Sequence, residues 1–296
     1  MAIKKKDQRW SVEKRLEFID FRLFWEGQIN RSDIMNQFGV SVPQASNDLS
    51  KYQEIAPKNI QYDHKQKRYF SNPSFKPAFI STDPDIFFSN LQDPLDENEN
   101  DTWLSYVPDH DFVKMPKRNM KAEVLKSLTD AMKDKKSLNI QYQSMSSEKP
   151  NWRIISPHAF AFDGMRWHTR SFCHKDNIYK DFLLSRIQSV GEIADEAYPD
   201  HQDLIWETYF KLILKPHPKL TDSQARAVEL DYDMTNHKLE LNIRLALLYY
   251  YLRRLGLQDC DGEASNPREQ HVVVSNKVET KEALEASIKA ERRDND

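Results

Sequence analysis

The stretch WRIISPHAFAFDGMRWHTRSFCHKDNIYKDFLLSRIQSV, residues 152–190, is the most informative part of this chain. Its pattern is that of short β-strands, and side chains on a strand alternate between two faces, so Arg166, His168 and Arg170 are expected on one face. Three cationic or protonatable groups on one face repel each other unless an anion or carboxylates lie opposite. The stretch therefore favours a site for a phosphate or nucleic acid. The alternative is a solvated face with scattered, weak ion pairs.

The order of residues in this stretch resembles the WYL domain, a small Sm-like or SH3-like β-barrel that serves bacterial regulators as a ligand sensor. The triplet that names the family stands here as Trp167-His168-Thr169, so a histidine takes the place of the tyrosine. The Arg-Trp-His core is most similar to the subgroup of repressors that guard anti-phage defence operons. The matching segments are Arg153-x-Ile155-x-Pro157-His158, GMRWHTRSFC at 164–173 and LSRI at 184–187.

The resemblance implies a ligand pocket, for which we expect an anionic effector such as a nucleotide or single-stranded nucleic acid. Alternation places His168 and Arg170 on one face, and Arg153 and Arg186 match basic positions that the WYL pattern implies, so these four residues are expected to converge on the pocket. A guanidinium there can hold phosphate through two parallel hydrogen bonds. The competing interpretation makes these arginines structural, paired with Asp163, Asp176 or Asp181. A strand is also expected at 137–143. In the WYL family a serine or basic group just after this strand helps form the pocket, and Ser144 or Ser146 fits that place, although both also suit a plain turn. The predicted ligand-binding residues are Ser144, Arg153, His158, Arg166, Trp167, His168, Arg170 and Arg186.

Residues 11–56 predict three helices. An apolar stripe with helical spacing follows Ser11, a second helix can be capped by Asn30, and Gly39 supplies a tight turn. Ser41 is followed three residues later by glutamine, with proline in the first turn, which is typical of a helix start. The side chains expected to face the core from this third helix are Val42, Ala45, Leu49, Tyr52 and Ala56.

The other face of the third helix carries short amides and hydroxyls, which suit base edges in a DNA major groove. The alternative is a plain helical hairpin with a polar surface. The next segment, NIQYDHKQKRYF at 59–70, has two short apolar strands around a basic turn, as in a wing that presents cations to phosphates. These runs resemble the winged helix-turn-helix of the same defence-operon repressors. The predicted DNA-binding residues are Ser41, Pro43, Gln44, Ser46, Asn47, Ser50, Lys51, Lys65, Lys67 and Arg68.

Charge is unevenly distributed along the chain, although the net charge is only −3. Lys and Arg against Asp and Glu number 13 to 9 in residues 1–75, 0 to 9 in 81–111, 15 to 7 in 112–190 and 14 to 21 in 191–296. Two basic blocks in distinct segments fit two anionic partners. We expect an α+β multidomain protein with a winged helix-turn-helix at 1–75, an acidic linker at 76–118, a WYL ligand-sensing domain at 119–198 and a C-terminal α/β dimerisation domain at 199–296.

The last part of the chain resembles the small α/β module that follows WYL domains and is often involved in dimer contacts. Its helix LLYYYLRRLGL, 247–257, is densely apolar, which is more often a core face than an interface. A repressor of a palindrome needs a two-fold dimer, however, and this helix is one candidate to supply it. Strands are expected at 206–214, 237–243 and 271–274, and helices at 221–230, 245–255 and 278–290.

Several functional classes lack their signature. The chain has six glycines and no GxGxxG, GxxxxGKS or GxSxG motif. His158, His168, Cys173 and His174 lack zinc-site spacing, and two cysteines cannot build a disulfide framework. No 18-residue apolar run exists, and the basic start lacks the apolar stretch of a secretory signal. We expect no enzyme activity, metal, cofactor or membrane segment, and a cytoplasmic protein that joins the nucleoid when bound to DNA.

These features predict a dimeric winged-helix repressor of a bacterial phage-defence operon. It would bind a palindromic operator, an inverted repeat of double-stranded DNA, and respond to the anionic ligand of its WYL domain. A nucleic-acid-binding sensor without a direct transcriptional role remains an alternative, because the barrel alone could hold single-stranded nucleic acid. An RNA-processing accessory protein is a weaker one.

Overall fold

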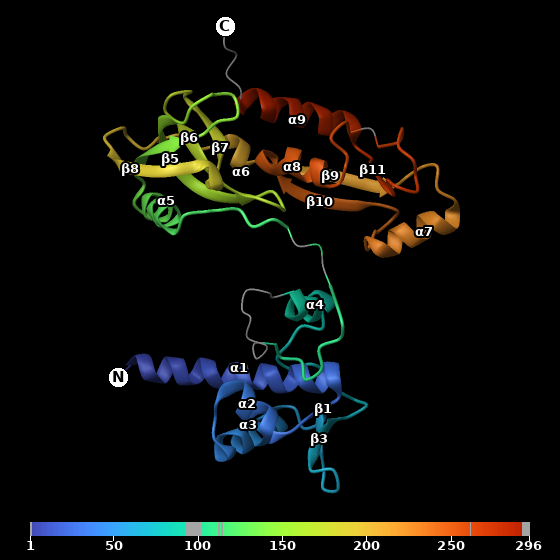
Figure 1. Ribbon diagram of the computed structural model, residues 1–296. Coiled ribbons are helices and arrows are strands. Elements are labelled where there is room, and N and C mark those ends of the chain that lie inside the picture. The colour runs from blue at the N-terminus through green and yellow to red at the C-terminus, as the bar shows by residue number, and fades with distance from the viewer. Residues whose placement is uncertain (1, 93–101, 112, 114, 261, 292–296) are drawn as a thin grey trace. The chain divides into compact units, whose positions relative to one another are not determined.

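A computed structural model describes residues 2–92, 102–111, 113, 115–260 and 262–291 (Figure 1). The chain forms two compact units, residues 1–114 and 115–296. None of the described helices is long and apolar enough to cross a membrane.

The first unit is a helix-turn-helix followed by a two-stranded wing. Its helices are α1 (Ala2–Glu26), α2 (Arg31–Phe38), α3 (Val42–Ile55) and, further along, α4 (Pro84–Gln92). Strands β1 (Gln28–Ile29), β2 (Ile60–Asp63) and β3 (Arg68–Ser71) form an antiparallel sheet in the order β1-β3-β2. The three predicted helices are confirmed, although α1 begins at Ala2 and not after Ser11.

Local capping explains where α2 and α3 begin and end. Asn30 and Asp33 form a reciprocal capping box at the start of α2, and Gly39 ends it with φ 62° in the left-handed region. The Ser41 hydroxyl caps α3 by accepting from the Gln44 amide nitrogen at 3.4 Å. The prediction that Val42 faces the core is wrong, since it is 50% exposed. The buried stripe starts one turn later, with Ala45, Asp48, Leu49 and Tyr52.

Part of the predicted linker packs on the helix-turn-helix. The Trp103 ring makes edge contacts with Phe18 and Phe21 at centroid distances of 5.8 and 5.5 Å. The carboxylate of Asp20 accepts from the backbone nitrogens of Ala78 and Phe79, both at 2.8 Å. These contacts tie segments on either side of α4 to α1.

The second unit begins with α5 (Ala122–Asp134) and a five-stranded antiparallel sheet in the order β7-β6-β5-β4-β8. Figure 1 shows α5 against one face of this sheet, and Leu128 and Ile140 are fully buried between them. The strands are β4 (Ser137–Tyr142), β5 (Asn151–Phe162), β6 (Trp167–Cys173), β7 (Ile178–Leu183) and β8 (Ile187–Ala194), with a short 3-10 turn η1 (Leu184–Arg186) before β8.

The prediction of a closed barrel is wrong. In the described residues, β7 and β8 are the two edges of the sheet and do not pair with each other. The ladder shifts register between Pro157 and Ala159, but this bulge does not close it. Contacts from the C-terminal part of the unit cover the face opposite α5, so the sheet does not have to close on itself to protect that face.

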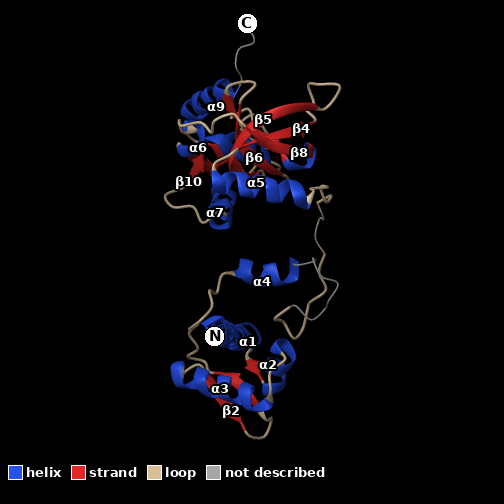
Figure 2. Cartoon of the chain, turned by 90° about the vertical axis from the view of Figure 1, so that its left-hand side faces the viewer, coloured by secondary structure: helices blue, strands red, loops and turns tan. Residues whose placement is uncertain are grey.

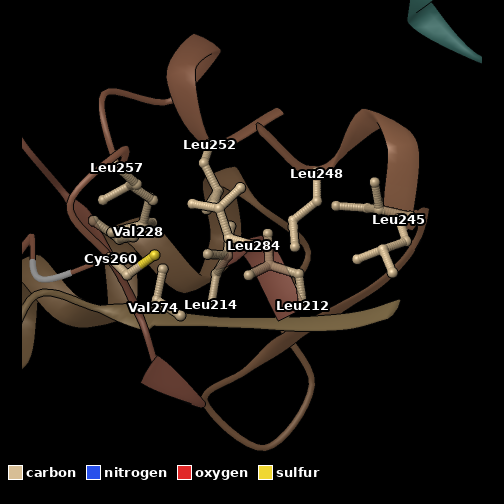
Figure 3. Close-up of a cluster of buried hydrophobic side chains, with 12 residues drawn as sticks. Leu212, Leu214, Val228, Leu245, Leu248, Leu252, Leu257, Cys260, Val274 and Leu284 are labelled. Carbon is tan, nitrogen blue, oxygen red and sulfur yellow. The ribbon is translucent and has the colours of Figure 1, made fainter. Parts of the chain in front are cut away.

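The C-terminal part, where Figure 2 labels β10, α7 and α9, has a three-stranded antiparallel sheet in the order β10-β9-β11. It has its own core of buried side chains (Figure 3). The predicted strand at 206–214 begins later, because Asp203 caps a helical turn there. Leu248 and Leu252 are fully buried, so α8, the helix within the apolar segment 247–257, contributes to the core. The elements are α6 (Leu204–Glu207), β9 (Tyr209–Pro216), α7 (Asp222–Asp231), β10 (Leu239–Arg244), η2 (Leu245–Leu247), α8 (Leu248–Arg254), β11 (Val272–Val274) and α9 (Lys277–Glu291).

Candidate functional site

Buried polar contacts join the core-facing side of helix α3 to α1. The Arg15 guanidinium binds the Asp48 carboxylate at 2.6 Å, and both side chains are almost fully buried. The Tyr52 hydroxyl donates to Asp20, and burial together with this carboxylate raises the pKa of Tyr52, which keeps the hydroxyl a donor. Sequence reasoning missed Arg15, Asp20 and Asp48, because their roles depend on helices that meet only in the folded unit.

The opposite face of α3 carries most of the predicted DNA-binding residues. Asn47 makes no hydrogen bond through its amide to any residue that the structure describes. The amide of Gln44 instead donates to Asp48 at 3.1 Å, which leaves it less free to contact a base. Ser41, Pro43, Asn47, Ser50 and Lys51 are exposed, whereas Gln44 and Ser46 are partly covered.

The turn of the wing presents the predicted cations to solvent. Asp63 stabilises the turn by accepting from the backbone nitrogens of Gln66 at 3.0 Å and Lys65 at 2.7 Å, and these bonds lower the pKa of its carboxyl. Lys65, Lys67 and Arg68 are exposed, and within the described ranges none has a carboxylate within the 4.0 Å of an ion pair. The three cations are therefore free to contact phosphate.

A cavity of about 350 Å³ lies between the start of α2 and the wing. It adds one cation that sequence reasoning missed, Arg31, which is exposed at the first position of α2. The backbone N–H groups at this end of a helix also favour an anion. The residues around the cavity are Asn30, Arg31, Ser32, Tyr62, Gln66, Lys67, Arg68 and Tyr69.

In the second unit, Arg170 is fully buried and bound by two carboxylates. Its Nε and Nη2 donate to the two oxygens of Asp203 at 2.6 and 3.3 Å, and its Nη1 donates to Asp181 at 3.4 Å. His158 contacts the same Asp203 at 3.2 Å, and His168 contacts Asp163 at 3.2 Å. His168 and Arg170 share one face of β6, as predicted, and that face meets carboxylates.

The carboxylates of this network are held in their ionised form. Burial alone would raise the pKa of Asp203, but the hydrogen bonds from His158 and Arg170 lower it to about 2. Burial likewise opposes ionisation of Asp163, and the bonds from Arg166, Met165 and His168 lower its pKa to about 2. Burial and the nearby Asp203 raise the pKa of Tyr179 to about 12.

The remaining predicted ligand residues are not brought to one place. Ile155 and Cys173 are paired and therefore point to the same face of the sheet. Arg153 is two residues from Ile155 and shares this face, whereas Arg170 is three residues from Cys173 and points to the other face. Arg153 binds Asp176 at 3.2 Å and Arg166 binds Asp163 at 2.8 Å. The interpretation of these arginines as structural names Asp163, Asp176 and Asp181 as their partners. The ion pairs of Arg153 with Asp176 and of Arg170 with Asp181 agree with it.

Three predicted ligand residues keep accessible groups. Trp167 is 46% exposed and lies against Phe162, with ring centroids 4.9 Å apart. Arg186, in η1, is half-buried and has no carboxylate partner in the described part of the chain. Ser144 exchanges a hydroxyl contact of 2.8 Å with Ser146 in the turn after β4.

Sequence reasoning also missed Asp203, which joins Arg170 to the next module. Its only local signal is its place before the helical turn LIWE, where an aspartate is a common N-cap. Among the described residues, no three or more His, Cys, Asp or Glu side chains lie together in a way that could hold a metal ion.

The chain matches three protein-family models, one after another. Residues 11–93 match the BrxR transcriptional regulator winged helix-turn-helix domain, 123–191 the WYL domain, and 209–280 the BrxR transcriptional regulator C-terminal dimerization domain. The solved structure of proteasome accessory factor B/C (PafBC) of Arthrobacter aurescens is 16% identical with a TM-score of 0.26, covering 58% of this chain and 28% of that chain. That similarity is too low to carry an argument.

Curated relatives match almost the whole chain. The DNA-binding transcriptional repressor CapW of Stenotrophomonas maltophilia is 38% identical over 93% of this chain and 92% of its own length. CapW of Pseudomonas aeruginosa is 34% identical over 94% of this chain and 93% of its own length. The chain thus belongs to the CapW family of DNA-binding transcriptional repressors, which are regulators and not enzymes.

Proposed function

We propose that this protein represses a bacterial phage-defence operon by binding a palindromic operator as a dimer. Helix α3 of each subunit enters a major groove, and the wing contacts the flanking backbone. The protein acts in the cytoplasm, on the nucleoid when bound to DNA. The phage-defence role follows from the resemblance to repressors of such operons.

One observation carries the DNA-binding part of the proposal. The outer face of α3 and the wing turn together expose polar groups and cations that no carboxylate neutralises in the described residues. Asn47 offers an amide that can bond an adenine edge in both directions, whereas Lys65, Lys67 and Arg68 offer charge for phosphates. The surface therefore offers one group that can recognise a base and three that can bind the DNA backbone.

The dimer is needed because an inverted repeat has two-fold symmetry. The match of residues 209–280 to a dimerization domain supports a dimer made by the C-terminal part. Two subunits then place two copies of α3 on the two half-sites.

The proposed effector is an anion bound by the WYL domain. Arg186 supplies a charge without a carboxylate partner in the described residues, Trp167 supplies an exposed ring, and Ser144 a hydroxyl. Arg153, His158, Arg166, His168 and Arg170 already contact carboxylates, so an anion reaches them only by displacing one. Such an exchange changes DNA binding only if the anion binds one dimer arrangement better than the other.

Recovery of genomic DNA fragments on the purified protein tests the proposed function. Sequencing of the retained fragments should enrich one inverted repeat, upstream of a defence operon or of the protein's own gene. The matched control is the K65Q/K67Q/R68Q variant, which should retain far less DNA of every sequence. Unselective recovery by the wild-type protein contradicts the repressor proposal and favours a sequence-independent nucleic-acid sensor.

A further inference from the structure

The Arg170 guanidinium binds Asp203 at the start of the C-terminal module and, within its own sheet, Asp181, which contacts that module through Tyr250. Its first partner, Asp203, also caps α6 by accepting from the Trp206 backbone nitrogen at 3.2 Å. The Arg244 side chain on β10 then donates to the Trp206 carbonyl at 2.6 Å and lies over the Trp206 ring at 4.8 Å. This first arm runs from β6 through α6 into the C-terminal sheet.

The second arm reaches α8. Asp181 on β7 accepts from Arg170 through one carboxylate oxygen and from the Tyr250 hydroxyl, at 2.9 Å, through the other. The Tyr250 ring also lies against His168, with centroids 5.2 Å apart. Arg170 is 0% exposed, so its guanidinium binds Asp203 directly and supports Asp181 from within the sheet. His158 also contacts Asp203.

The order of the domains gives this connection a mechanical role. The DNA-binding unit joins the chain ahead of the five-stranded sheet, and the part that matches a dimerization domain follows it. In a dimer held by the C-terminal modules, the covalent chain of each subunit runs from that module through the five-stranded sheet toward the DNA-binding unit. The junction between the sheet and the C-terminal module therefore lies on the covalent path between the two copies of α3 in such a dimer.

We infer that Arg170 is a positioning residue, which fixes the C-terminal module on the WYL sheet and so sets the half-site spacing that the dimer recognises. Asp203 and Asp181 are the two contacts through which it acts. The part concerning half-site spacing depends on the proposed function, whereas the junction itself does not. An anion that takes a carboxylate's place on Arg170 then loosens one arm.

Hydrogen–deuterium exchange of the full chain tests the junction directly. Arg170→Met removes the contact to Asp203 and the support of Asp181, Asp203→Asn weakens the α6 arm while an asparagine still caps the helix, and Asp181→Asn weakens the α8 arm. Arg153→Met is the control for the loss of an arginine from this sheet, because it breaks a more exposed ion pair on the opposite face.

Each variant has its own expected exchange pattern. Arg170→Met should speed exchange about 10-fold or more in both 204–208 and 248–255, while β5 and α5 stay protected. Asp203→Asn should speed only 204–208, and Asp181→Asn only 248–255. A uniform rise across residues 115–291 in the Asn variants, or a pattern equal to that of Arg153→Met, overturns the inference, even if Arg170→Met fails to fold.

Binding to inverted repeats whose half-sites are moved apart one base pair at a time tests the functional part. The wild-type protein and Arg153→Met should prefer one spacing, whereas Asp203→Asn and Asp181→Asn should reduce that preference at least about 3-fold. An unchanged preference overturns the role in spacing. If the wild-type protein selects no inverted repeat, the proposed function fails, and the exchange pattern still decides whether the junction exists.

Discussion

The cations of the wing and those of the WYL sheet have opposite surroundings, although both sets read as basic patches in the sequence. Lys65, Lys67 and Arg68 are exposed and lack a carboxylate partner in the described ranges. Arg170, by contrast, is fully buried between Asp181 and Asp203. A basic residue therefore indicates an anionic partner only when the fold leaves its charge unanswered, and a buried, paired one indicates a structural connection.

The largest expected difference between the two regions is in stability. Arg170→Met leaves two carboxylates buried without their cation, so the free energy of unfolding should fall by about 3–5 kcal/mol. The same substitution at exposed Arg68 should change it by less than about 0.5 kcal/mol. Urea unfolding of both variants measures this, and equal losses would mean that burial does not separate the two classes of cation.

A smaller effect is expected for base recognition by α3. Asn47→Ala should weaken binding to the cognate site by about 1–3 kcal/mol and change binding to random duplex little, because base contacts carry the specificity. Gln53→Ala, an exposed amide of the same helix outside the predicted DNA-binding residues, is the control for the loss of a polar group. Competition titrations with both duplexes give the answer, and equal losses on both would exclude Asn47 as a base reader.

The pH dependence of stability sharpens the other side of the comparison. The pKa of Asp203 is lowered from 3.8 to about 2, so its contribution is fully present above pH 3.8 and is lost as the pH falls through about 2. That contribution is roughly 2 kcal/mol. Between pH 5 and 2, the free energy of unfolding should fall in both proteins. The fall should be about 2 kcal/mol smaller in Asp203→Asn than in the wild type, because the variant has no carboxyl to protonate at this position. Parallel curves for the two proteins would show that the pair does not hold the carboxyl ionised.

Local signals predicted the DNA-binding unit well. Ser41, Pro43 and Gly39 place the ends of α2 and α3, because capping and turn preferences act over a few residues. The face of α3 that carries Asn47 follows from helical periodicity alone. The core position of Asp48 did not follow, since its partner Arg15 is 33 residues away.

The WYL sheet was predicted less completely, for a physical reason. Alternation places His168 and Arg170 on one face of a strand, but it does not say which groups lie opposite. The partner of Arg170, Asp203, is 33 residues further on, directly before a helical turn whose last two residues were predicted to begin a strand. Closure of the barrel depends on pairing between the edge strands β7 and β8, which alternation does not specify either.

The salt dependence of operator binding tests most directly whether exposed, unpaired cations are the ones that contact DNA. Log K for operator binding falls as log salt concentration rises, and in the K65Q/K67Q/R68Q variant this negative slope should be shallower by about 3, close to one for each lost phosphate contact. The K180Q/R153M/R166M variant removes the same charge from three cations of the WYL domain that are paired with carboxylates, and it should leave the slope unchanged. Equal slopes for the two triple variants would contradict the account.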